Sequence, residues 1–320
     1  MSGDGHPPVG VLLMTYGSPA TAEEVPAYLA SVRGGREADA ELVEEFKRRY
    51  QVIGFSPLVR ITQAQGQALQ EMLDAEHGQG CFRVEVGMLH SEPRIDPALR
   101  RFAAAGVKRV VGVVLSPQWS PIIMGGYTGA VDAASGQMVA DGAEVSVAGP
   151  WHLLPEFIEA LSDRVGEALA RFPAERRDTV PVILTAHSLP KAVVDREPEY
   201  LEQLMATVQA VVERVGLKPG RWQFAYQSAG HSPEEWLKPD LKDLFPDLHA
   251  AGKREVLVVP VQFLADHLEI LYDIDVAARE EAEGAGIEFN RIELMNTSPA
   301  FISALSAVVA RELQPAAGAA

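Results

Sequence analysis

The sequence predicts an α/β protein made of two similar lobes, each a four-stranded parallel sheet flanked by helices. Short β-branched runs alternate with longer amphipathic stretches along the chain, which is typical of βαβ units. The alternation restarts near Pro150, and segments of the two halves resemble each other: LLMTYGSP matches ILTAHSLP, and VGMLHSEP matches FAYQSAGHSP. We therefore predict an N-terminal lobe over residues 1–149 and a C-terminal lobe over 150–320, with a ligand cleft between their strand ends.

The first lobe is expected to begin with a buried strand, because a short apolar run without alternation suits a strand that is covered on both faces. Thr21, with Glu24 three residues later, predicts a capping box that opens a helix toward Val32. Glycine, serine and proline clusters separate the later elements. The predicted strands are 9–14, 82–88, 109–115 and 144–148, and the predicted helices are 21–32, 39–50, 62–77, 97–105 and 128–139.

The second lobe is organised around the segment PVILTAHSLP, an apolar run that ends in His187. Ligands bind at the carboxyl edge of an open parallel sheet, so an imidazole there is placed for chemistry. A loop histidine held by backbone hydrogen bonds would give the same pattern. The other predicted strands are 222–226, 255–259 and 288–293, and the predicted helices are 155–172, 198–215, 265–283 and 300–313.

Composition excludes several classes of function. The 320 residues carry 28 Lys and Arg against 44 Asp and Glu, a net charge of −16, which argues against nucleic acid or an anionic bilayer as the main partner. Cys81 is the only cysteine, so the chain has no internal disulfide and no cysteine-ligated iron–sulfur cluster of its own; we expect a buried apolar thiol. The longest apolar runs are too short to cross a bilayer, which predicts a cytoplasmic protein without an integral membrane segment.

The second chemically informative segment is VQFLADHLEILYDID, residues 261–275. Asp266 is placed to cap a helix with Glu269 as its partner, which would be a purely structural role. Glu269 and Asp273 share one helical face with no cation between them, a repulsion that a divalent metal would relieve. Together with His187, Glu269 would form an open, incomplete ligand set that suits a transition metal in transit.

These segments resemble ferrochelatases, which insert ferrous iron into a porphyrin. The resemblance rests on TAHSLP, VPVQFLADHLEILYD, LLMTYGSP, RYQVIGFSPL and MNTSPAFISAL, and it runs from about Val9 to Leu313. It implies two Rossmann-like lobes with the porphyrin between them. It also implies a metal chelatase, a lyase, that takes Fe²⁺ as a substrate and has no permanently bound cofactor.

The resemblance assigns roles to residues by position. His187 and Glu269 match the catalytic pair that handles the metal and the pyrrole protons, and Asp273 falls on a possible metal path. Tyr16 matches the tyrosine axial to iron in soluble enzymes that use coproporphyrin III, which favours that substrate and a monomeric, cytoplasmic enzyme. Positions around the porphyrin and its propionates are matched by Arg33, Arg49, Tyr50, Ser56 and Tyr127.

Three departures from the family pattern weaken parts of this assignment. The turn IGFSP is one residue short, so the alignment of Ser56 is less secure; Ala277 interrupts the acidic row of Glu269 and Asp273; and Gln118 and Trp119 replace a His-Phe pair. The alternatives are a protoporphyrin IX ferrochelatase, a cobalt or nickel chelatase for another tetrapyrrole, and a haem-binding carrier on the same fold. A dinucleotide-binding enzyme is disfavoured because no G-x-G-x-x-G follows a strand.

Overall fold

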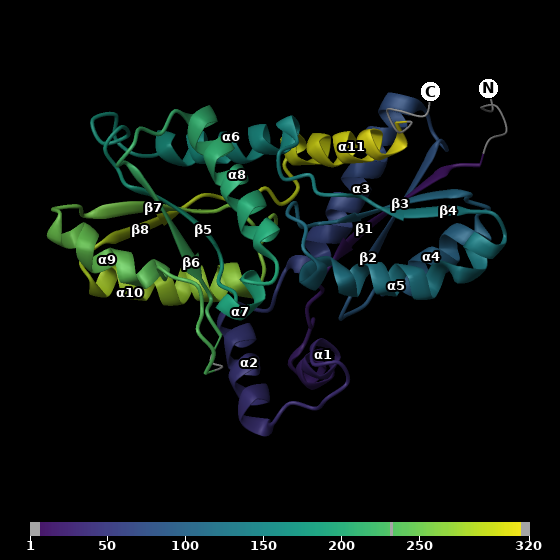
Figure 1. Ribbon diagram of the computed structural model, residues 1–320, viewed down its shortest axis with the longest axis horizontal. Helices are drawn as coiled ribbons and strands as arrows, with labels where there is room; N and C mark the ends of the chain where they lie inside the picture. The colour runs from purple at the N-terminus through teal and green to yellow at the C-terminus, as the bar shows by residue number, and fades with distance from the viewer. Residues whose placement is uncertain (1–6, 231–232, 315–320) are drawn as a thin grey trace.

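Two four-stranded parallel sheets form the frame of the molecule. The computed structural model describes residues 7–230 and 233–314, and Figure 1 shows the two sheets side by side with helices around them. The first sheet has the order β2-β1-β3-β4 and the second the order β6-β5-β7-β8, so each half repeats the same topology. This confirms the predicted fold class. The strands are β1 (Val9–Thr15), β2 (Phe82–Met88), β3 (Arg109–Val114), β4 (Glu144–Val147), β5 (Val182–His187), β6 (Trp222–Gln227), β7 (Glu255–Pro260) and β8 (Glu288–Arg291).

Strand register brings the functional segments to one edge of each sheet. In the first sheet β1 lies between β2 and β3, and Thr15 pairs with Met88 at the carboxyl end. In the second sheet β5 holds the equivalent central place, and His187 pairs with Gln227. Tyr16 and His187 therefore lie at corresponding positions of the two halves, as the match of LLMTYGSP with ILTAHSLP predicts.

The helices differ in length and type. Those of the first half are the 3₁₀ helix η1 (Ala22–Glu24), α1 (Val25–Val32), α2 (Ala40–Val52), α3 (Leu58–His77), α4 (Ile95–Ala104) and α5 (Pro121–Ala140). Those of the second half are α6 (Pro155–Ala170), α7 (Lys191–Val194), α8 (Pro198–Val215), α9 (Leu241–Ala250), the π-helix η2 (Glu269–Ala278), α10 (Arg279–Gly284) and α11 (Pro299–Leu313). Within the described residues no helix is long and apolar enough to cross a membrane.

The two halves share one large hydrophobic core. Successive side chains of β1 point to opposite faces, so Val11 and Leu13 join this shared core, whereas Leu12 and Met14 pack in a smaller core with α4 and α5. Helix α11 contacts α3 and β3 of the first half and α6 of the second, and it lies beside α6 along the top of the molecule in Figure 1. The division of the chain at residues 149 and 150 stays a prediction.

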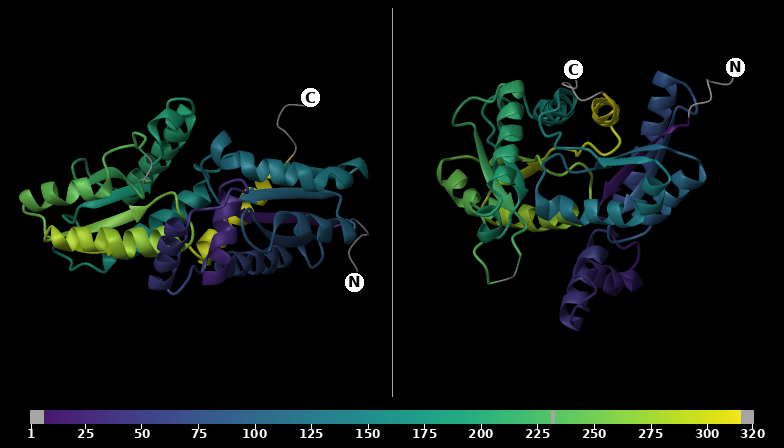
Figure 2. Two further views of the ribbon diagram at one scale, coloured as in Figure 1. Left: turned by 90° about the horizontal axis from the view of Figure 1, so that it is seen from below. Right: turned by 45° about the vertical axis from the view of Figure 1, so that its right-hand side comes forward.

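Helices α1 and α2 form a projection below the junction of the two halves (Figures 1 and 2). Their small core contains Val25, Leu29 and Tyr50, and Leu268 from the second half packs against it. Leu268 directly precedes Glu269. The projection is therefore anchored to the segment that carries the candidate catalytic residues.

Several predicted boundaries are wrong, for identifiable reasons. Helix α5 begins at Pro121 because Ser120 accepts a hydrogen bond from the Ile123 amide at 3.1 Å, and the glycines at 125 and 126 lie inside the helix. Helix α3 likewise begins earlier than expected, at Leu58. Thr21 makes no capping hydrogen bond and precedes only the 3₁₀ turn η1.

Two further predictions are wrong, namely the set of helices in the second half and the burial of Cys81. Helix α9 was missed, although Asp240 and Asp243 form a capping box at its start and Pro246 lies within it. Cys81 is exposed rather than buried, and its thiol donates to the His77 carbonyl at 3.1 Å.

A candidate active site at the junction of the two halves

Strand β5 places His187 at the carboxyl edge of the second sheet. Its backbone amide donates to Oε1 of Gln262 at 2.9 Å, and its ring Nδ1 contacts the Ser188 carbonyl oxygen. Since a carbonyl oxygen only accepts, this contact places the proton on Nδ1. Nε2 is then left facing Oε2 of Glu269 at 3.7 Å, which confirms that the two residues predicted from the sequence lie together.

A second histidine, which the sequence analysis did not single out, lies on the other side of Glu269. Nε2 of His267 is 3.8 Å from the same Oε2 atom, and Nδ1 of His267 bonds the Ala265 carbonyl at 3.0 Å. The ring of Phe263 packs against this imidazole at a centroid distance of 4.6 Å. The sequence carried a signal for this contact in the H-L-E spacing of ADHLE. A side chain two residues before the start of a helix can reach forward to the first turn of that helix.

The α-helix predicted over 265–283 does not begin at Ala265, so Glu269 does not lie in its first turn. It is the first residue of the π-helix η2, and the residue at its cap position is Leu268 rather than Asp266. Asp266 instead accepts a hydrogen bond from the side chain of Asn296 at 2.8 Å, so the predicted capping role of Asp266 is wrong.

The two imidazoles determine the charge state of the carboxylate. Burial alone would raise the pKa of Glu269, but the positive charge that His187 and His267 carry when protonated outweighs it and lowers the pKa to about 2. Burial lowers the pKa of His267, and the nearby negative charge of Glu269 more than reverses this, so that the pKa is raised. Glu269 is therefore ionised at neutral pH, and its oxygen is placed to take a proton or a metal cation.

Tyrosines of the first half lie within the electrostatic reach of Glu269. Burial, followed by the charge of Glu269, raises the pKa of Tyr16, and burial is also the first cause for Tyr50, whose pKa is raised to about 12. Tyr16 is 42% exposed and packs edge-on against His90 at a centroid distance of 4.4 Å. Tyr50 is buried and its hydroxyl accepts from Oγ of Ser18 at 3.4 Å. Tyr50 thus lies in the small core against which Leu268, the residue before Glu269, packs.

Arg49 supplies the cation that the sequence analysis found missing beside the acidic pair. Nη1 of Arg49 lies 3.7 Å from Oδ1 of Asp273, and its Nε bonds Glu45 at 2.7 Å. Its guanidinium also lies 5.2 Å from the ring centroid of Tyr272, a cation–π distance. A substrate carboxylate that binds Arg49 would therefore compete with Asp273.

The remaining residues assigned by resemblance are more scattered. Arg33 is exposed at the end of α1, and its carbonyl accepts from Nε of Arg36 at 3.1 Å. Oγ of Ser56 accepts from the Leu58 amide at 3.3 Å at the start of α3. Tyr127 is buried in the smaller core, where burial and then Tyr16 raise its pKa. Contact with a porphyrin stays a prediction for all three.

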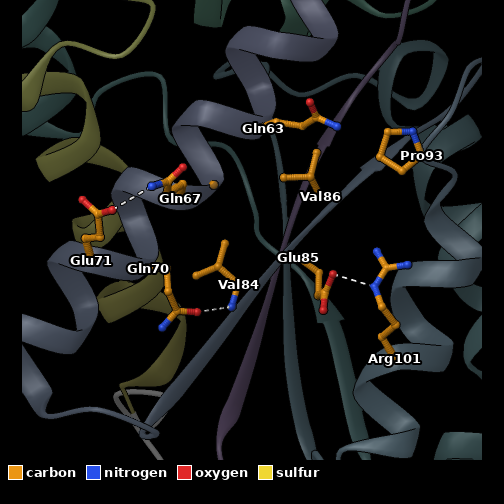
Figure 3. Close-up of a pocket in the computed structure, with 10 residues that line it drawn as sticks. Gln63, Gln67, Gln70, Glu71, Val84, Glu85, Val86, Pro93 and Arg101 are labelled. Carbon is orange, nitrogen blue, oxygen red and sulfur yellow. Dashed lines mark hydrogen bonds and ion pairs between the residues drawn. The ribbon is translucent and has the colours of Figure 1, made fainter.

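The site is open in its ligand set. In the part of the chain that the structure describes, no group of three or more His, Cys, Asp or Glu side chains is arranged to hold a metal. Two imidazole nitrogens instead approach the same carboxylate oxygen of Glu269, an arrangement that can pass on a proton or a cation without enclosing it. A cavity of about 670 Å³ lies elsewhere, between α3 and the edge strand β2, where Arg101 pairs with Glu85 (Figure 3).

Comparisons with known proteins show the family of the chain. The Ferrochelatase family model matches residues 8–313. The chain is 39% identical to a ferrochelatase of Herpetosiphon aurantiacus over 93% of this chain and 97% of that protein. It is 35% identical to a coproporphyrin III ferrochelatase of Geobacillus sp. over 96% and 98% of the two chains. The solved structure of SirB from Bacillus subtilis with Fe³⁺ has the same fold, with a TM-score of 0.61, 13% identity and 95% of each chain covered. The chain belongs to the ferrochelatase family.

Proposed function

We propose that the chain inserts Fe²⁺ into coproporphyrin III to form iron coproporphyrin III in haem biosynthesis. The observation that carries this proposal is the position of Oε2 of Glu269, 3.7 Å from Nε2 of His187 and 3.8 Å from Nε2 of His267. Insertion forms four iron–nitrogen bonds and releases the two pyrrole protons, so the reaction needs groups that accept protons and briefly hold a cation. His187 and Glu269 are the catalytic pair of this proposal.

The roles within the pair follow from protonation. Glu269, with a pKa of about 2, is ionised at neutral pH and can take a proton from the macrocycle or coordinate Fe²⁺. His187 with its proton on Nδ1 offers a lone pair on Nε2. A flat porphyrin cannot present all its nitrogen lone pairs to a metal on one side, so the site must bind the ring bent, and binding energy offsets the distortion. Asp273 would extend the path for the incoming metal.

Two observations favour coproporphyrin III over protoporphyrin IX. Tyr16 directly follows β1, at the position that corresponds to His187 at the end of β5, and it matches the tyrosine axial to iron in enzymes that use coproporphyrin III. The relatives at 32–35% identity, from Geobacillus sp. and Bacillus subtilis among others, are coproporphyrin III ferrochelatases. Coproporphyrin III carries a propionate on each pyrrole ring, and Arg33 and Arg49 are cations that could bind such groups.

The same proposal includes a porphyrin bound beside Tyr50, Ser56 and Tyr127, and a cytoplasmic, monomeric enzyme without a resident cofactor. Size-exclusion chromatography with light scattering tests the monomer. Tyr50→Phe and Ser56→Ala, compared by porphyrin fluorescence titration, test the two hydroxyls as binding contacts.

The activity test is anaerobic mixing of the purified chain with Fe²⁺ and either porphyrin, followed by visible absorption. We expect iron coproporphyrin III to form, and His187→Ala to abolish its formation while porphyrin binding is retained. A preference for protoporphyrin IX would keep the chelatase and overturn the substrate. Tight porphyrin binding without insertion of iron into either would favour the haem carrier.

A further inference from the structure

The turn that carries His267 and Glu269 is held by a residue far away in the sequence. Oδ1 of Asn296 accepts a hydrogen bond from the Asp266 backbone amide at 2.9 Å, and Nδ2 of Asn296 donates one to Oδ2 of Asp266 at 2.8 Å. Its own backbone amide donates to the Leu264 carbonyl at 2.9 Å. Three hydrogen bonds therefore join one asparagine to residues 264–266, directly before the two functional side chains.

Asn296 has an unusual backbone conformation for this task. Its φ is +43°, in the left-handed region that asparagine tolerates better than most residues other than glycine. This conformation costs free energy and persists only when the surrounding contacts hold it. The hydrogen bonds to the 264–266 turn are contacts of that kind.

The first half of the molecule reaches the same residue. Gln65 on α3 is fully buried, and its Nε2 donates to the Asn296 carbonyl at 2.7 Å. The side chain of Asn296 thus holds the turn of the second half, while its carbonyl is held by a helix of the first. A shift of one half against the other would be transmitted to His267 and Glu269 through this residue.

Asp266 is fixed from its other side as well. Arg291, at the end of β8, donates to both carboxylate oxygens of Asp275 at 2.7 and 2.6 Å and lies 3.5 Å from Oδ1 of Asp266. Asp275 is on the π-helix, so the turn and the helix are tied to the same strand. Asp266 is therefore part of a framework rather than a free ligand for iron.

We propose that Asn296 is a positioning residue, which orients His267 and Glu269 by locking the turn before them and couples that turn to α3 through Gln65. This inference rests on the proposed function, because the orientation matters for proton and metal transfer at Glu269. Hydrogen-bonded partners that orient catalytic or ligating groups are typically worth about 10- to 100-fold in activity or metal affinity. Asn296 acts through the turn and need not touch the substrate.

The test is Asn296→Gly in the full chain. Glycine keeps the backbone conformation and the backbone hydrogen bonds but removes both side-chain bonds to Asp266. We expect kcat for metal insertion to fall roughly 10- to 100-fold, with an unchanged KM for the porphyrin. Asn296→Asp, which keeps only the acceptor, should not restore the rate, and Gln65→Ala should show a smaller loss. The matched control is Gln67→Ala, an exposed residue of α3 that bonds only Glu71 among the described contacts.

A second readout does not depend on catalysis. With ¹⁵N-labelled histidine, we expect the imidazole resonances of His267 to shift or broaden in Asn296→Gly and to stay unchanged in Gln67→Ala. Wild-type kcat together with unchanged His267 resonances would overturn the inference. If the His267 resonances shift in Asn296→Gly but the wild-type protein inserts no metal, the positioning role is kept and the proposed function is overturned.

Discussion

Replacement of Glu269 by glutamine tests the centre of the proposed site. The amide keeps the shape of the side chain and removes its negative charge. A cation held 3.7 Å from the carboxylate, the distance that separates Oε2 of Glu269 from Nε2 of His187, would be attracted by about 4–5 kcal/mol at an effective dielectric constant of about 20. Because the Glu269 side chain is 37% exposed, water screens part of this, and about 2–3 kcal/mol remains for a cation or a proton held there.

That free energy corresponds to a loss of roughly 30- to 150-fold in the rate of metal insertion. The assay is the anaerobic insertion rate with coproporphyrin III, with fluorescence quenching to show that porphyrin still binds. The control is Glu280→Gln on α10, an exposed glutamate that should leave the rate unchanged. A rate for Glu269→Gln that equals the wild-type rate, with porphyrin bound, would refute the assignment of proton or metal transfer to this carboxylate.

Three further outcomes are expected. The pKa of Glu269 is lowered from 4.5 to about 2, so its ionised form stabilises the fold above about pH 4.5. This contribution is lost as the pH falls toward 2. The free energies of unfolding of wild type and Glu269→Gln, measured in urea, should therefore converge between about pH 4.5 and 2. Arg49→Gln should raise the porphyrin KM by roughly 10- to 100-fold, since a charge-assisted hydrogen bond to a propionate is lost. Arg100→Gln on the surface of α4 should leave this KM unchanged. Equal KM values for the two variants would argue against Arg49 as an anchor. Phe301→Ala should lower the free energy of unfolding by about 3–5 kcal/mol in urea titration, because Phe301 is fully buried in the core that both halves share, and the exposed Ile122→Ala provides the comparison.

Much of the candidate site could be predicted from short stretches of sequence. His187 was expected at the carboxyl edge of a buried strand, and β5 ends at this residue. Glu269 was expected on a helix after the next strand, at the same edge as His187, and it lies 3.7 Å from that imidazole, although the helix is a π-helix that begins at Glu269 rather than at Ala265. Both predictions use signals within a few residues, namely an apolar run and its polar end, and such signals survive in the folded chain.

Other features of the site depend on residues that are far apart in the sequence. Arg49 meets Asp273 across the two halves, so the acidic pair that looked uncompensated has a cation beside it. The role expected for Asp266 as a helix cap failed because Asn296 satisfies its carboxylate and amide instead. Hydrogen-bond partners at such separations leave no local periodicity to find.

By itself, the sequence determined the class of fold, the repeated order of strands and helices, and the strand end that bears His187, because hydrophobic periodicity and turn residues act over a few positions. The tertiary structure decided which side chains share the site with Glu269. The pKa of His267 is raised by the carboxylate of Glu269, 3.8 Å away, and Arg49 reaches Asp273 from the other half of the molecule. Electrostatic and hydrogen-bond energies depend on distance in space, and that distance exists only once the shared core has brought the two halves together.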